Sequence, residues 1–182
     1  MTKMTDLFSN AEVSQWNHLK FAAFFRMHRR DPLQLPCYRA ERELHQRWTA
    51  EERPWAGKLS LRQGQALARE IWRAWGLAGR VYQPPLETMR KSRSGTVGQY
   101  RWIHRQPSYS KVRIMVAYRT PLTVIHEYVH AARQLTGKDY WGLHDEEFMG
   151  DVGWTLGKLY SEEAEVEYSA LATVETMKEI GR

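Results

Sequence analysis

The chain has 182 residues, of which 42% are hydrophobic and 12% are aromatic, so it can bury a core and is not a disordered segment. Its single cysteine, Cys37, excludes an internal disulfide framework and a cysteine-based zinc ribbon, and it favours a reducing compartment. Because no run of roughly 18 apolar residues occurs, we expect a soluble, cytoplasmic protein with no membrane span.

The net charge of +6 is unevenly distributed along the chain. Residues 1–118 contain 21 Lys/Arg and 9 Asp/Glu, a balance of +12, whereas residues 119–182 contain 6 Lys/Arg and 12 Asp/Glu, a balance of −6. Such asymmetry is typical of a protein with one face for a polyanion. An ordinary solvated surface is the alternative interpretation.

The N-terminal part of the chain predicts two helices. Apolar residues recur at helical spacing over residues 11–29, two prolines interrupt the pattern in "RDPLQLPCYR", and "RAERELHQRW" predicts a second helix over residues 39–48. The segment "EERPWAGK" reads as a linker. We therefore predict an N-terminal helical extension over residues 1–57 and a main domain over residues 58–182.

The main domain opens with a helix and continues with short strands. Ser60 and Gln63 form a capping-box pattern, and Gly76 is a plausible end of that helix. Three strand-like segments follow, of which the last alternates apolar and basic residues with a period of two. They are residues 79–83, 98–105 and 111–119. Short strands flanked by helices predict an α+β fold, with a small three-stranded sheet packed by helices.

The segment "TPLTVIHEYVHAARQLTG" predicts a helix over residues 120–136 that carries a metal-binding pattern. Thr120 suits the N-cap. His126 and His130 are four residues apart, so both imidazoles project from one side of the helix and can reach one zinc ion. Glu127 lies about 100° around the helix, where it could accept a proton from the attacking water.

A catalytic zinc site needs a third protein ligand if the fourth position is to stay open. His144 follows His130 by a spacer long enough to end the helix and turn back, and acidic residues that suit the start of another helix come directly after it. Glu162 or Glu163 could instead complete a site of the glutamate-ligand type.

The order of helix, short sheet, "VIHEYVHA", spacer and "GLHDEEF" resembles the catalytic domain of the SprT-like (Spartan-type) zinc metalloproteases, over roughly residues 58–160. The resemblance implies a zincin-like core with zinc held by His126, His130 and His144, and with Glu127 as the catalytic acid/base. The single cysteine cannot build the C-terminal zinc ribbon that many bacterial relatives carry. For the oxyanion-stabilising group, Tyr140, Tyr160 and His104 are the candidates.

Basic residues interleaved with aromatic ones suggest a nucleic-acid surface, because cations track phosphates and aromatic rings stack on bases. The candidates are Arg90, Lys91, Arg93, Arg101, Trp102, Arg105, Lys111 and Arg113. The SprT-like resemblance implies a protein substrate bound or crosslinked to DNA. Two alternatives remain: a zinc protease with a specific target that is not on DNA, such as a regulator or a virion component, and a noncatalytic basic nucleic-acid-binding protein.

Overall fold

The computed structural model describes residue 31 and residues 33–53, 55–90, 98–101, 107–138 and 144–180. Over these ranges it shows five α-helices and three strands, so the α+β class is confirmed. The helices are α3 (Gln34–Ala50), α4 (Leu61–Ala74), α5 (Pro121–Leu135), α6 (Glu146–Leu159) and α7 (Glu162–Ile180). The predicted helix over residues 11–29 lies outside the described residues.

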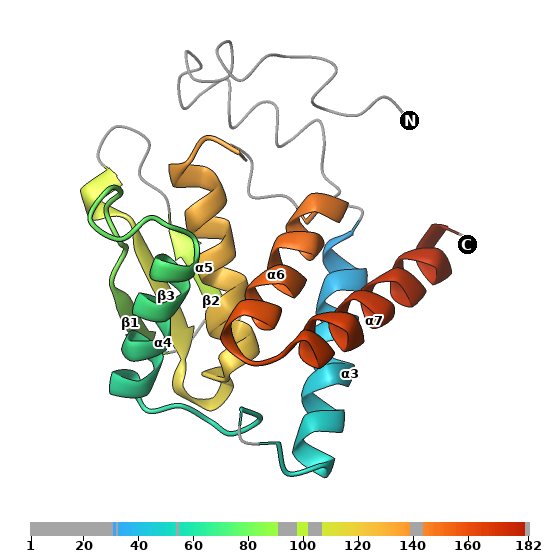
Figure 1. Ribbon diagram of the computed structural model, residues 1–182. Coiled ribbons are helices and arrows are strands. Elements are labelled where there is room, and N and C mark those ends of the chain that lie inside the picture. The colour runs from blue at the N-terminus through green and yellow to red at the C-terminus, as the bar shows by residue number, and fades with distance from the viewer. Residues whose placement is uncertain are drawn as a thin grey trace.

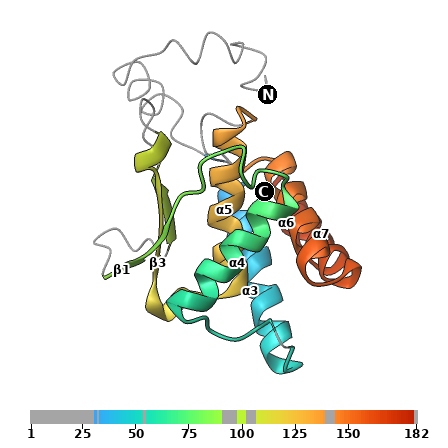
Figure 2. The ribbon, with the colours of Figure 1, turned by 60° about the vertical axis from the view of Figure 1, so that its left-hand side comes forward.

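The strands form one small mixed sheet. Its order is β1 (Leu86–Met89), β3 (Lys111–Met115), β2 (Gly98–Arg101), with β1 parallel and β2 antiparallel to β3. Val112 and Ile114 of β3 are fully buried, and alternation along the strand turns Lys111 and Arg113 to the other face. Figure 2 shows the sheet edge-on, with the helices gathered on one side of it.

The predicted strand boundaries need correction. Residues 79–83 form a turn rather than a strand, because Gly79 takes a φ of +74° and two prolines follow at positions 84 and 85. The first strand is instead β1. The third strand ends at Met115, where a 3₁₀ turn at Val116–Tyr118 leaves the sheet and exposes its side chains.

The helix α4 begins as the sequence predicts. The side chain of Ser60 accepts a hydrogen bond from the backbone N–H of Gln63, and the Gln63 side chain accepts one from Ser60 N–H. Gly76 follows the helix with a φ of +67°. Gly64 lets α4 approach β1 closely, because a Cβ at this position would lie 2.7 Å from the Leu86 side chain.

The helix α3 starts five residues before the predicted one. Pro36 is tolerated because it lies in the first turn, where backbone N–H groups have no partner within the helix. Ala40, Leu44 and Trp48 are buried in the same hydrophobic cluster as the inward residues of α5, α6 and α7. Figure 1 shows α3 behind α6 and α7, and the structure thus joins residues 34–50 to the core of the main domain.

The helices α6 and α7 pack against each other, α6 packs on α5, and α7 packs along α3. Tyr168 of α7 is fully buried and lies 3.5 Å from the Cys37 sulfur of α3. None of the described helices is both long and apolar enough to cross a membrane.

Candidate metal centre

The helix α5 is the central element of the site. Thr120 caps it by accepting a hydrogen bond from Thr123 N–H, and Pro121 occupies its first turn. Nearly every residue of α5 is buried, including His126, Glu127 and His130. These three polar side chains therefore lie in the interior, where they need specific partners.

His144 comes to α5 from the start of α6. Asp145 caps α6 by accepting a hydrogen bond of 2.6 Å from Phe148 N–H. The buried guanidinium of Arg133 on α5 binds Asp151 at 2.7 Å and Asp145 at 3.3 Å. These ion pairs tie the first turns of α6 to α5 and so place His144, itself 4% exposed, beside the other two histidines.

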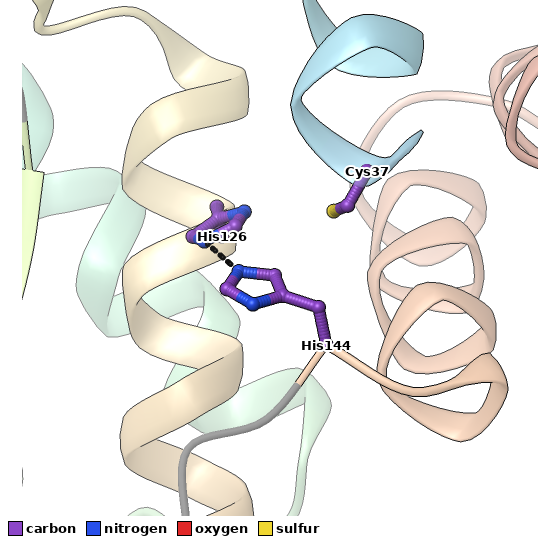
Figure 3. Close-up of side chains that lie close together, drawn as sticks. All are labelled: Cys37, His126 and His144. Carbon is purple, nitrogen blue, oxygen red and sulfur yellow. Dashed lines mark hydrogen bonds between the residues drawn. The ribbon is translucent and has the colours of Figure 1, made fainter. Parts of the chain in front are cut away.

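The three imidazoles converge through their Nε2 atoms. His144 Nε2 lies 3.1 Å from His126 Nε2 and 3.3 Å from His130 Nε2. The ring centroids of the three pairs are 4.8–4.9 Å apart. Figure 3 shows His144 reaching up from its loop toward His126 on α5. The structure thus brings together the three predicted metal ligands.

The opposite ring nitrogens of two of these histidines meet carboxylates. His126 Nδ1 lies 2.6 Å from Glu41 of α3, and His144 Nδ1 lies 2.6 Å from Asp31. Burial alone would lower the pKa of His126, but the Glu41 carboxylate outweighs it and raises that pKa well above its ordinary value. Burial, with His126 and His144 beside it, holds the pKa of His130 well below its ordinary value.

Two aromatic rings enclose the cluster. Phe148 stacks on His130 at 4.1 Å between centroids and also packs edge-on against His126 and His144. The Tyr38 ring lies 5.3 Å from both His126 and His144, and its side chain is 44% exposed. Phe148 therefore closes the centre from within, while Tyr38 stands between the centre and solvent.

A cysteine lies close to the same histidines. Cys37, His126 and His144 offer ligand atoms within 4.8 Å of one another and form a buried cluster that could bind a metal. The Cys37 sulfur also lies 3.5 Å from Glu41, and burial raises the pKa of its thiol to about 11. The three-imidazole set shares His126 and His144 with this cluster and has His130 in place of the thiol.

Glu127 is next to the imidazoles but turns toward the sheet. It is 6% exposed, and burial raises its pKa to about 7 against the opposing influence of His126 and a backbone hydrogen bond from Tyr100. A Cβ on Gly98 would lie 2.5 Å from a Glu127 carboxylate oxygen. The glycine of β2 thus leaves the space that this carboxylate occupies.

The alternative site residues lie elsewhere. Glu162 and Glu163 are exposed in the first turn of α7, where Glu163 binds Arg53 at 2.9 Å. Tyr160 follows the C-terminal end of α6 and stacks on Trp55 at 5.3 Å. This end is about 20 Å along the helix from His144. Tyr140 and His104 lie outside the described residues.

Part of the predicted nucleic-acid surface is described. Arg101 lies opposite Lys111 in the β2–β3 register, and Arg113 shares that outer face. Glu87 of β1 binds Lys111 at 2.7 Å and lies 3.9 Å from Arg113. Arg90 is exposed just after β1. The other candidates, Lys91, Arg93, Trp102 and Arg105, are not within the described ranges.

The residues at the centre that were not predicted from the sequence include Asp31, Cys37, Tyr38, Glu41 and Gly98. Glu41 stands in an alternation of Glu and Arg that indicates only an exposed helix face. Its contact with His126 spans 85 positions, and that of Asp31 with His144 spans 113. No local pattern signals such contacts. Comparisons of the chain with protein-family models, curated proteins and solved structures found no match.

Proposed function

We propose that the protein is a zinc-dependent endopeptidase of SprT-like type with a zincin-like core, acting on DNA-associated proteins. The observation that carries this proposal is the convergence of His126, His130 and His144 beside the buried carboxylate of Glu127. Three imidazoles and a neighbouring general base are the residue set of a hydrolytic zinc site with one open position.

Two of the three spacings between the ring nitrogens fit the ion. Ligands about 2.0–2.1 Å from a tetrahedral zinc lie about 3.3 Å from one another. The separations from His144 Nε2 to His126 Nε2 and His130 Nε2 are 3.1 and 3.3 Å. Three neutral nitrogens suit zinc, nickel or copper better than calcium or magnesium, which prefer oxygen ligands.

The hydrogen bonds behind the rings also favour a cation. When Nδ1 of His126 donates to Glu41 and Nδ1 of His144 donates to Asp31, the lone pairs of the neutral rings lie on Nε2. These two Nε2 atoms then face each other at 3.1 Å in a buried space. Their repulsion is relieved only by a proton or a metal ion between them.

Glu127 is the proposed general base and acid. When bound, zinc would polarise the scissile carbonyl and lower the pKa of a water molecule toward about 7. Glu127 accepts the proton of the attacking water and returns it to the leaving amine, which its raised pKa of about 7 suits. The hydroxyl of half-exposed Tyr38 is a candidate donor to the tetrahedral oxyanion.

The DNA association is supported by the outer face of the sheet. Arg101, Lys111 and Arg113 share that face, on the side away from α5. Glu87 neutralises part of this charge, which favours the second candidate, a zinc protease whose target is not on DNA. A phosphate surface predicts binding that weakens steeply with salt, and cleavage stimulated by DNA, whereas the second candidate predicts neither.

The first experiment is elemental analysis of the purified protein. Wild type should carry about one zinc per chain, and His144→Ala should lose most of it. His45→Ala, which changes a histidine of α3 that is not a member of the cluster, is the matched control and should keep the wild-type content. Wild type with no zinc, or His144→Ala with full zinc, would refute the proposed centre. Cleavage of a DNA-bound protein, with and without DNA, then separates the two candidates.

A further inference from the structure

We infer that Glu41 and Asp31 are positioning residues of the metal centre, which hold His126 and His144 with Nδ1 protonated and Nε2 directed at the ion. This inference rests on the proposed zinc site. It assigns to Asp31 and to the helix α3 a supporting part in metal binding, exerted through the histidines.

Glu41 acts on the first ligand. Its Oε1 atom lies 2.6 Å from His126 Nδ1, and the two side chains are 13% and 3% exposed. A contact this short and this shielded is a strong, charge-assisted hydrogen bond. It fixes the rotation of the imidazole and makes Nε2 more basic, as carboxylate partners of metal-bound histidines do.

Asp31 acts on the third ligand in two ways. Its Oδ2 atom lies 2.6 Å from His144 Nδ1 and 2.9 Å from the backbone nitrogen of His144. One oxygen therefore accepts from the ring and from the main chain of the same residue. This double contact fixes His144 at the point where the chain enters α6, although His144 belongs to no regular element.

His130 differs from the other two ligands. Its Nδ1 atom is buried and has no hydrogen-bond partner among the described residues. Its ring is held instead by stacking on Phe148 at 4.1 Å and by the turn of α5 that carries it. Two of the proposed ligands are thus oriented by carboxylates and one by packing. The carboxylates can therefore be altered without changing α5, which carries His126 and His130.

The helix that carries Glu41 is anchored against α7. Trp48 of α3 is buried and donates a hydrogen bond of 2.7 Å to Glu167 on α7. Arg39 binds Glu179 at 3.2 Å near the other end of the two helices. Because α3 is fixed at both ends against α7, Glu41 between them cannot follow His126 if the imidazole rotates.

Conservative variants test the inference in the full-length protein. Glu41→Gln and Asp31→Asn keep the shape and an accepting oxygen but remove the charge, and Glu41→Ala removes both. The matched control is Glu43→Gln, on the same helix, where Glu43 pairs with Arg47 near the surface. Zinc affinity is measured by competition with a chelator. The visible spectrum of the cobalt-loaded protein reports the geometry of the ligands, and the Tm of the metal-free protein reports folding.

We expect zinc affinity to fall about 10–100-fold in Glu41→Gln and Asp31→Asn, and further in Glu41→Ala, with a shifted cobalt spectrum. The metal-free Tm of the two conservative variants should match that of Glu43→Gln. Should they bind zinc within twofold of wild type with an unchanged cobalt spectrum, the positioning role is wrong while the zinc site stands. Wild type that binds no zinc would refute the proposed function itself, and the inference with it.

If a variant does not fold, the inference can still be tested on the wild-type protein. In zinc-loaded wild type, nitrogen NMR should show slowly exchanging Nδ1–H protons on His126 and His144, because both are hydrogen-bonded in the interior. The Nδ1–H of His130 should exchange faster or lack the downfield shift of a carboxylate partner. Three equivalent signals would contradict the assignment of distinct partners.

Discussion

The helices α5 and α3 meet at the same candidate metal centre but contribute to it in different ways. In α5 the two histidines and the glutamate stand within five residues, and the spacing of one helical turn brings them together. In α3, Glu41 reaches His126 only because the whole domain folds around both. The three residues of α5 with proposed roles are thus encoded locally, whereas the proposed orienting residue of α3 depends on packing between distant segments.

Glu127→Gln gives the largest expected effect and tests the chemical side of this comparison. The amide cannot accept the proton of the attacking water, so peptide cleavage should fall by about 10³-fold or more while the zinc content stays that of wild type. Glu146→Gln, an exposed change in the first turn of α6, is the control. A Glu127→Gln protein with wild-type cleavage would remove Glu127 from the mechanism.

Arg133→Met tests a residue of α5 that supports the position of His144 and has no proposed role as ligand or base. The buried guanidinium binds the partly exposed Asp145 and Asp151, so its loss should lower the free energy of unfolding by about 2 kcal/mol and weaken zinc binding by releasing His144. Arg73→Met is the control, because Arg73 is exposed and its loss should cost less than about 0.5 kcal/mol. Urea unfolding measures the free energy of unfolding of both variants. If Arg133→Met and Arg73→Met lower it equally, the ion pairs of Arg133 do not support the centre.

Gly98→Ala should damage catalysis from the sheet side. The added methyl group would lie 2.5 Å from the Glu127 carboxylate and must displace it. A shift of about 1 Å in a catalytic group costs on the order of 10²-fold in rate, with zinc content preserved. The control is Gly150→Ala, where a methyl group meets nothing within 4 Å. Steady-state cleavage rates of the two variants test this prediction. A Gly98→Ala protein with wild-type activity would show that Glu127 has room to move.

The pH dependence of zinc binding gives the smallest effect. Glu41 raises the pKa of His126, so metal-free protein holds a proton there that zinc must displace. Affinity should therefore rise about tenfold per pH unit as the pH increases, until it passes the raised pKa. Chelator competition between about pH 6 and 8 measures the slope. In Glu41→Gln the slope should flatten near neutral pH, and an unchanged slope would assign the proton to another group.

The local elements could be predicted and the non-local ones could not. The caps at Thr120 and Ser60 depend on residues three positions away, and the structure confirms both. The strand β1 was missed because it has four residues and is defined by parallel pairing with β3. The start of α3 was missed because Pro36 reads as a break, although the first turn of a helix accepts it.

The residues of the candidate site likewise fall into those that a local pattern predicts and those that it does not. His126, Glu127 and His130 follow from one helical pattern, and His144 from the need for a third ligand and from a family resemblance. Asp31 and Glu41 offer no such pattern, because nothing near either residue in the sequence indicates which histidine it meets. Only the packing of α3 against α7 brings Glu41 to α5.

The contact between Asp31 and His144 also bears on when the proposed metal centre can form during synthesis of the chain. The two residues are separated by 113 positions, and α3 packs on α7, the last helix described. Closing so long a loop carries an entropic cost that is recovered only when the distant contacts form. A nascent chain that ends before α7 lacks the helix to which Trp48 and Arg39 of α3 bond, so Glu41 is held less firmly beside its imidazole. The proposed hydrolase would therefore complete its centre only after α7 has been synthesised.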